Sequence, residues 1–150
     1  MSTELRDWQA AMSLAAAWRH GQCPGEVDSA VIQCTVLRYG GVRLAFAGSD
    51  PSTHPAAAQW HVQDLGTAVL TAARVLVLGR AGPVSFGLAA VRRTWREPDG
   101  TALDYGQGTY KLVTPWPVWF DVALNVVGYH RLPPLRPPAH LARRLGRVDP

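Results

Sequence analysis

Apolar residues near the start of the chain recur at the three- and four-residue spacing of one helix face. The members of this stripe are Leu5, Trp8, Ala11, Met12, Leu14, Ala15 and Trp18. Such spacing is typical of an amphipathic helix that packs its apolar side on a core. Ser2 or Thr3 can cap the first turn, and Gly21 can end the helix. The pattern therefore predicts a helix over residues 3–19.

Two apolar runs follow, "SAVIQCTVLRY" at residues 29–39 and "VRLAFAG" at residues 42–48. Both are rich in β-branched or aromatic side chains, a composition that favours strands. Gly40 and Gly41 separate them and can take the positive φ of a two-residue turn. This stretch predicts an antiparallel hairpin.

Helical spacing returns between residues 56 and 78. The apolar positions there are Ala58, Val62, Leu65, Val69, Ala73 and Leu76. Pro55 suits the start of a helix, and Gly79 and Gly82 suit its end. The spacing predicts a central helix over residues 56–78, followed by a second group of strands that begins near Val84.

The stretch "VRRTWREPDGTALDY", residues 91–105, indicates a hairpin around a type I turn with Gly100 in the left-handed conformation. This register pairs Trp95 with Leu103. Alternation then assigns to the core face Val91, Trp95, Leu103 and Tyr105. It assigns to the solvated face Arg92, Thr94, Arg96, Ala102 and Asp104. "TYKLV", residues 109–113, predicts one more strand.

A third helix is predicted after Thr114, which can act as its cap, with Pro115 at the first position. Residues 118–127 are apolar on nearly all sides, Asp121 and Asn125 being the exceptions. A helix without a polar face in so small a domain indicates that a second subunit covers one side. We therefore expect a homodimer interface that contains Trp116, Trp119, Phe120 and Val126.

The predicted order is α-β-β-α-β-β(-β)-α, typical of a single α+β domain in which helices pack against an antiparallel sheet of four to five strands. The 150 residues, 47% of them hydrophobic, suffice for one core. This domain is expected to span residues 1–130. A Pro- and Arg-rich tail, residues 131–150, follows it. The tail matches a polyproline ligand in spacing, but a stiff spacer leading to a short basic helix is the simpler interpretation.

The formal net charge is +4, and only one of the fifteen basic residues is a lysine. This ratio is typical of GC-rich bacterial coding, so the arginines are only a modest indication of nucleic-acid binding. Five arginines lie in the last twenty residues, opposed by Asp149 alone. Candidate contacts to a partner or to nucleic acid are Arg92, Arg96, Tyr110, Lys111, Arg131, Arg136, Arg143 and Arg144.

Candidate chemistry is sparse. His20, Cys23 and Cys34, with His54 and His61, could in principle supply zinc ligands, but there is no paired Cys-x-x-Cys motif. We therefore expect no metal and no cofactor, and we expect both cysteines to be free thiols. His61 lies three residues before Asp64 and could form an oriented base on the predicted helix. A solvated pair on the outer helix face is the simpler interpretation.

No apolar run approaches the roughly twenty residues of a membrane helix, and the N-terminus lacks the pattern of a secretion signal, so a cytoplasmic protein without membrane contact is expected. The sequence favours a non-enzymatic interaction module that forms a homodimer and carries a basic tail, with an acidic protein as a further possible partner. Two alternatives stay open. One is a protein that binds single-stranded nucleic acid, and the other is a small-molecule enzyme with a pocket near His61 and Trp116.

Overall fold

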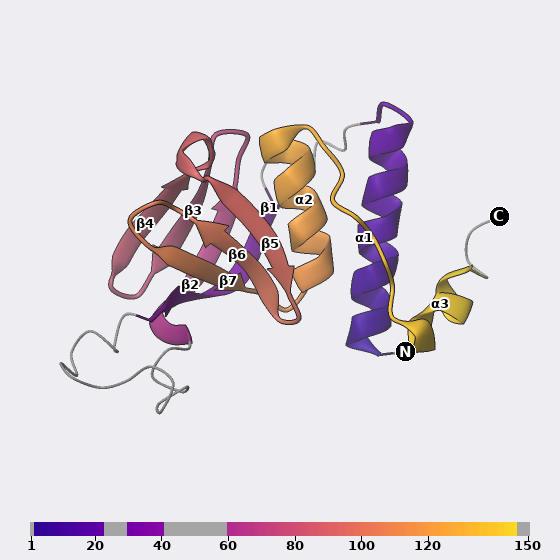
Figure 1. Cartoon of the computed structure of the whole chain (residues 1–150), viewed down its shortest axis with the longest axis horizontal. Coiled ribbons are helices and arrows are strands. Elements are labelled where there is room, and N and C mark those ends of the chain that lie inside the picture. Colours follow the sequence, from indigo (N-terminus) through magenta and orange to yellow (C-terminus); the bar gives the residue numbers. More distant parts are fainter. Residues whose placement is uncertain (1, 23–29, 41–59, 147–150) are drawn as a thin grey trace.

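The computed structural model of this chain describes residues 2–22, 30–40 and 60–146. The helices are α1 (Thr3–Arg19), α2 (Pro117–Tyr129) and α3 (Ala139–Gly146). The strands are β1 (Ala30–Tyr39), β2 (Trp60–Leu70), β3 (Arg74–Gly79), β4 (Gly82–Gly87), β5 (Arg93–Glu97), β6 (Gly100–Asp104) and β7 (Thr109–Val113) (Figure 1). The helix predicted over residues 3–19 is confirmed. The strand predicted over residues 42–48 lies outside the described residues.

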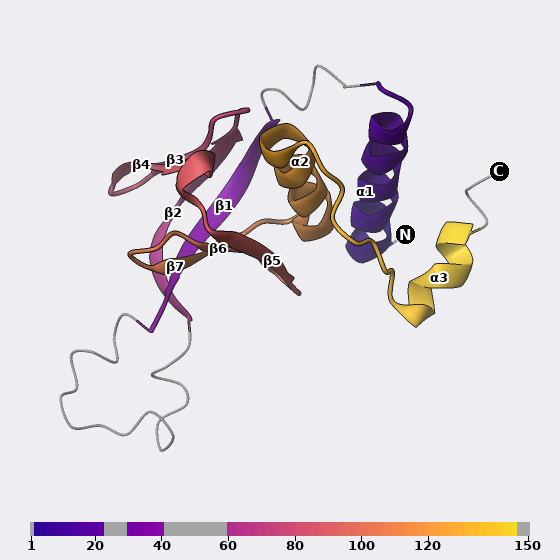
Figure 2. The ribbon, with the colours of Figure 1, turned by 45° about the horizontal axis from the view of Figure 1, so that its top comes forward.

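The seven strands form one antiparallel sheet in the order β4-β3-β2-β1-β7-β6-β5. The α+β class is therefore confirmed, but the prediction of four to five strands is too low. The sheet curls, and its two halves come close on the inner side (Figure 2). Phe86 of β4 lies 5.1 Å from Tyr110 of β7, measured between ring centroids. The backbone N–H of Gly87 donates to the hydroxyl of Tyr105 at 3.1 Å.

The prediction of a central helix over residues 56–78 is wrong, because its described part forms β2 and β3. This stretch carries two periodicities at once. Ala68 and Leu70, and then Val75 and Val77, are buried alternating positions of two strands. β-branched residues favour a strand over a helix. Because β2 pairs with β1 along its whole length, the strand forms in place of the helix.

The hairpin of β5 and β6 has a register one residue away from the predicted one. Trp95 pairs with Ala102 and not with Leu103. Gly100 does not adopt the left-handed conformation that the prediction required. It is a strand residue at which a Cβ atom would clash with the backbone carbonyl of Leu112 in β7.

This shift moves side chains to the opposite face, as a one-residue slip must. Leu103 is buried on the side of the helices, whereas Trp95 lies on the other side with Ala102. Arg96, expected in solvent, lies on the helix side. Its guanidinium carbon is 5.0 Å from the centre of the Trp8 ring of α1. Thr94, also expected in solvent, pairs with Leu103 and lies on the helix side as well. The predicted assignment of faces in this hairpin is therefore wrong for Thr94, Trp95, Arg96 and Ala102.

The second described helix, α2, begins at Pro117, so the prediction of Thr114 as its cap is wrong. The residue before Pro117 provides no side-chain hydrogen bond to the helix. Asp7 of α1 does so instead. Its carboxylate accepts hydrogen bonds from the N–H groups of Val118 at 2.9 Å and Trp119 at 2.8 Å. Two of the free N–H groups of the first turn are thereby satisfied by another helix.

Within this chain α2 is buried on almost its whole circumference. Of residues 118–127, only Trp119 is not fully buried. β6 packs against one side of α2 and α1 against the other (Figures 1 and 2). The apolar circumference that suggested a second subunit is thus covered by elements of the same chain.

The Pro- and Arg-rich tail runs back along the helices and ends in α3, beside the first turns of α1 (Figure 1). Leu141 and Leu145 of α3 are each 4% exposed and belong to the core cluster. Leu132 and Leu135 pack half-buried against the same cluster. The described part of the tail is therefore a packed layer of the domain.

We expect that replacing Asp7 with alanine lowers the free energy of unfolding by about 1–2 kcal/mol, because two amides at the start of α2 lose their acceptor. Arg6→Ala changes an exposed residue of the same helix and serves as the matched control. Urea unfolding followed by circular dichroism measures both variants. Equal losses in the two variants would contradict the assigned role of this side chain.

Replacing Leu145 with alanine is expected to cost about 2–4 kcal/mol, the usual range for a buried leucine. The neighbouring exposed Arg144→Ala should cost under about 0.5 kcal/mol. Thermal unfolding of the two variants tests whether the tail is part of the cooperative core. A Leu145→Ala variant as stable as Arg144→Ala would show that α3 is dispensable.

Candidate interaction surface

The sheet carries its helices on one side, and the opposite side exposes large apolar side chains. We call this surface the helix-free face and define it by five residues of β1, β2 and β3. Their exposed fractions are 64% for Val31, 63% for Val62, 52% for Leu78, 51% for Tyr39 and 41% for Leu65. Exposed apolar residues are normal when they are scattered, but a contiguous group marks a surface that another molecule covers.

Strand geometry explains how these residues reach one face. The intervening Cys34, Val36 and Ala68 point to the helix side and are buried. Val62 and Leu65 are three residues apart, so plain alternation would place them on opposite faces. β2 contains a register shift between Asp64, the partner of Val36, and Val62, the partner of Leu37. The extra residue in β2 brings Val62 and Leu65 to the same face.

The middle of the helix-free face carries no formal charge in the described parts of β1, β2 and β3. The remaining outward positions are Gln33, Thr35, Leu37, Thr67, Val69 and Leu76. Arg74 and Arg80 lie only at the two ends of β3. The surface is therefore apolar and neutral at its centre, with Arg74 and Arg80 toward the two ends of β3 and Lys111, the β7 partner of Leu37, beside β1.

A hollow of about 700 Å³ crosses this face where Gly66 pairs with Gly79. A Cβ atom at Gly66 would clash with the backbone of β3, so glycine permits the close approach of the two strands. Side chains that line the hollow include Gln33, Thr35, Leu65, Thr67, Leu78, Arg80 and Thr114. The hydroxyl of Thr114 is buried and has no hydrogen-bond partner among the described residues.

A second hollow of about 450 Å³ adjoins the first and shares Gln33 and Pro115 with it. Its other lining residues are Ala10, Val31, Ile32, Trp116 and Trp119. It is mainly apolar, and two half-buried tryptophans form part of its wall. Tryptophans in such recesses are frequent anchors of protein interfaces.

Asp64 fixes the turn between β3 and β4, which lies at the edge of the helix-free face. Its carboxylate accepts hydrogen bonds from the N–H groups of Leu65 at 2.8 Å and of Arg80 and Ala81 at 3.1 Å each. The bond from Leu65 is the main cause that lowers the pKa of Asp64. Asp64 thus anchors the turn between β3 and β4. The helix on which it was predicted to share a face with His61 is not formed.

The four residues predicted for a homodimer interface separate into two pairs. Trp116 and Trp119 are half-buried and line the apolar hollow next to Val31. Phe120 and Val126 are buried inside the chain at 0% and 1% exposure, so they offer no surface to a partner. The sheet residues of the helix-free face were not predicted, because their segment was assigned to a helix.

The basic and aromatic residues predicted around the hairpin do not form one platform. Lys111 is 7% exposed, and its Nζ lies 3.0 Å from Asp99 and 4.9 Å from the centre of the Trp60 ring. Tyr110 packs against Phe86 on the inner side of the sheet. Arg92 is exposed, whereas Arg96 lies over Trp8.

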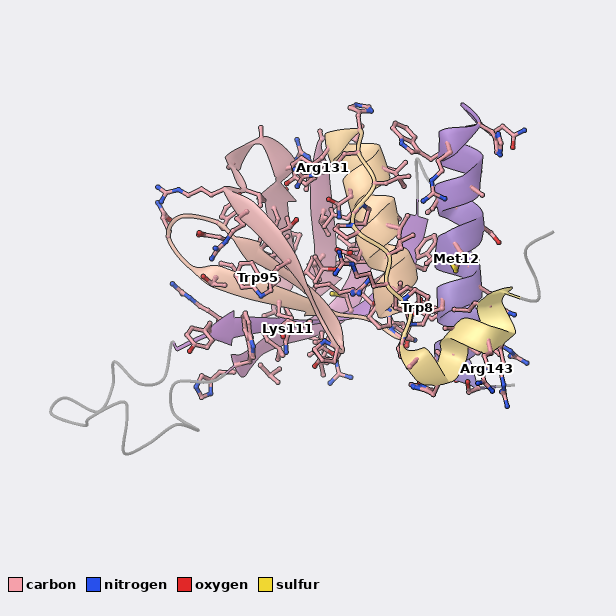
Figure 3. The ribbon with its side chains drawn as sticks, turned by 45° about the vertical axis from the view of Figure 1, so that its right-hand side comes forward. Trp8, Met12, Trp95, Lys111, Arg131 and Arg143 are labelled. Atoms are coloured by element: carbon pink, nitrogen blue, oxygen red, sulfur yellow. The ribbon has the colours of Figure 1, made fainter. Side chains whose placement is uncertain are left out.

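The tail arginines lie elsewhere. Arg131 and Arg143 are at opposite ends of the helical layer (Figure 3). The Nε of Arg131 donates to the side-chain oxygen of Asn125 at 3.2 Å, and its guanidinium stacks on Tyr129. Arg136, Arg143 and Arg144 are exposed near the first turns of α1. The eight predicted contacts are therefore spread over several surfaces.

Polar groups inside the domain form a separate cluster around Asp121, which is 4% exposed. Thr101 donates to its carboxylate at 3.4 Å, and the Asn125 amide lies at the same distance. Burial raises the pKa of Asp121, and the charge of Arg96 opposes this shift. Burial also raises the pKa of the Cys34 thiol to about 12, so it is a poor nucleophile at neutral pH.

Three further observations concern the metal site, the pocket near His61 and the membrane. No group of three His, Cys, Asp or Glu side chains that could hold a metal occurs in the described ranges, and Cys23 and His54 lie outside them. The hollow that contains Trp116 does not include His61. No helix in the described part of the chain is long and apolar enough to cross a bilayer.

Asp7 is the structural residue that sequence reasoning missed, although a signal was present. Asp7, Ala11 and Leu14 follow helical spacing, so this carboxylate lies on the face predicted to be apolar. A charged residue at such a position requires a partner inside the protein. The partner, the first turn of α2, is more than a hundred residues away and could not be identified from spacing.

No protein-family model, curated protein or solved structure matches this chain.

Asp121→Asn is expected to become more stable relative to the original protein as the pH rises from about 4 to about 7. The raised pKa of Asp121 means that the native state holds this proton more tightly than the unfolded chain. The protonated Asp121 therefore stabilises the native state fully below the pKa of about 3.9 that it has in the unfolded chain. This stabilisation is lost as the pH rises through the higher pKa of Asp121 in the native state. Urea unfolding across this pH range provides the measurement.

Asp64→Asn is the control with the opposite sign. Because the pKa of Asp64 is lowered, its contribution is present above the unfolded pKa and is lost as the pH falls through the folded value. The original protein should therefore exceed Asp64→Asn in stability near neutral pH, and the difference should shrink in acid. Parallel pH trends in the two variants would contradict these assignments.

Proposed function

We propose that this chain is a non-enzymatic interaction module that forms a homodimer through its helix-free face. The proposal is carried by the exposure on one surface, uncharged at its centre, of Val31, Tyr39, Val62, Leu65 and Leu78. Only the other side of the sheet is covered by the described helices. The apolar circumference of α2 is covered within this chain and leaves little surface for a partner.

The energetics favour coverage of this surface. Removing apolar area from water contributes about 25 cal/mol per Å². A stable interface buries about 800 Å² on each partner, which is the area that the helix-free face and its surroundings would have to supply. The adjoining hollow lined by Trp116 and Trp119 extends the surface and provides a recess for an anchoring side chain.

Charge supports a second copy as the partner. Two neutral centres can meet about a two-fold axis without placing like charges opposite each other. An acidic or basic partner would find no opposite charge at the centre of the face, since Arg74 and Arg80 lie at the ends of β3. A partner with the same apolar and neutral character fits best, and a copy of this chain has that character.

The described side chains with catalytic potential have structural roles that support a non-enzymatic reading. Asp7 caps α2, Asp64 anchors a turn, and Asp121 is enclosed in an internal hydrogen-bond cluster. Cys34 is buried with a raised thiol pKa. None of these groups opens into the apolar hollow as a pair of acid and base.

The original chain is expected to sediment with twice its mass of 16.3 kDa at micromolar concentration. Val62→Lys combined with Leu78→Lys should raise the dissociation constant more than about tenfold, because two lysine charges would have to be buried in an apolar interface. Both positions are over half exposed, so the fold should persist. Sedimentation velocity over a concentration series measures the change.

Ser13→Lys combined with Ala16→Lys is the matched control, since both residues are exposed on α1. It adds the same charge without touching the helix-free face and should leave the dimer intact. A strictly monomeric original chain would overturn the proposal. So would an equal loss of association in the control.

A further inference from the structure

We infer that the outer side of α3, together with Arg136, binds the phosphate backbone of single-stranded nucleic acid. We call this surface the basic corner and define it by Arg136, Arg143 and Arg144. All three are exposed, and none is in an ion pair with any other described residue. The basic corner is separate from the helix-free face, so this inference does not depend on the proposed dimer.

The corner is held rigidly. Leu141 and Leu145 fix α3 to α1 from the buried side of the helix. His140 of α3 lies 3.3 Å from the carboxylate of Glu4 in the first turn of α1. The arginines therefore project from a fixed helix, with Arg143 at the outer edge of the molecule (Figure 3).

Among the described residues, no acidic side chain forms an ion pair with the arginines of α3. Glu4 is engaged by His140, and Asp7 is used as the cap of α2. Glu4 and Glu97 line the same hollow of about 530 Å³ as Arg136, which makes Arg136 the least positive part of the corner. Arg143 and Arg144 carry the positive charge.

The chemistry of the surface selects the class of partner. The exposed residues of α3 are Ala139, His140, Ala142, Arg143 and Arg144, without a large apolar side chain. Protein interfaces depend on buried apolar or aromatic anchors, which are missing here. The apolar side of α3 is used inside the domain, so the helix cannot insert it into a bilayer. Guanidinium groups can bond phosphate oxygens in a bidentate manner, which leaves a polyphosphate backbone as the fitting ligand.

Fluorescence anisotropy with a labelled oligothymidylate, using the full chain, tests the inference. Neutralising about three phosphates should weaken binding roughly 15-fold between about 50 and about 200 mM salt. Arg143→Glu combined with Arg144→Glu should weaken binding at least about tenfold at low salt. Arg143→Gln combined with Arg144→Gln should show a smaller loss in the same direction, and it provides a neutral variant if charge reversal perturbs α3.

The matched control is Arg19→Glu combined with Arg92→Glu, two exposed arginines outside both the basic corner and the helix-free face. It changes the net charge equally and should lose less than about threefold. Equal losses in the two charge-reversal variants, or no binding by the original chain at low salt, would overturn the inference. Equal binding of polyglutamate or of phosphatidylserine vesicles would also overturn it, in favour of an acidic protein or a membrane.

Discussion

The fold depends on the contact between the Asp7 carboxylate and the first turn of α2. Both carboxylate oxygens accept backbone N–H groups there, at 2.8 and 2.9 Å. Desolvation raises the pKa of Asp7 even though these bonds and the nearby Arg96 favour its charged form. The hydrogen bonds offset only part of the cost of burial, and they join the first helix to the last third of the chain. Because α2 packs on β6, the same contact attaches α1 to the sheet.

Arg96 illustrates how charge is distributed inside and outside this domain. Its guanidinium lies over Trp8 and acts electrostatically on both Asp7 and Asp121. One of its nitrogens is buried without a hydrogen-bond partner in the described part of the chain. The attraction of this cation to the two carboxyl groups favours the observed arrangement of helices and hairpin, since a shift of either would weaken it. Arg143 and Arg144, by contrast, are exposed and form no ion pair with another described residue.

The described helices of this domain cover only one side of the sheet. α1, α2 and the described tail are all on the same side, so the core lies between them and the concave side of the curled sheet (Figure 2). The other side keeps apolar residues such as Val31 and Val62 in contact with water. A small domain with this asymmetry gains stability when a second molecule covers the exposed face, and this links the fold to the proposed self-association.

The sequence by itself determined the first helix, the strand β1, the α+β class and the basic character of the tail. Each of these depends on local periodicity or composition, such as the stripe from Leu5 to Trp18. Tertiary structure alone decided that residues 60–79 are strands, because their apolar residues satisfy helical and alternating spacing equally and pairing with β1 selects one. It also decided the hairpin register, where the backbone of β7 excludes a side chain at Gly100. The cap of α2 and the helix-free face could not be predicted for the same reason: both arise from contacts between segments far apart in the chain, whose energies no local pattern contains.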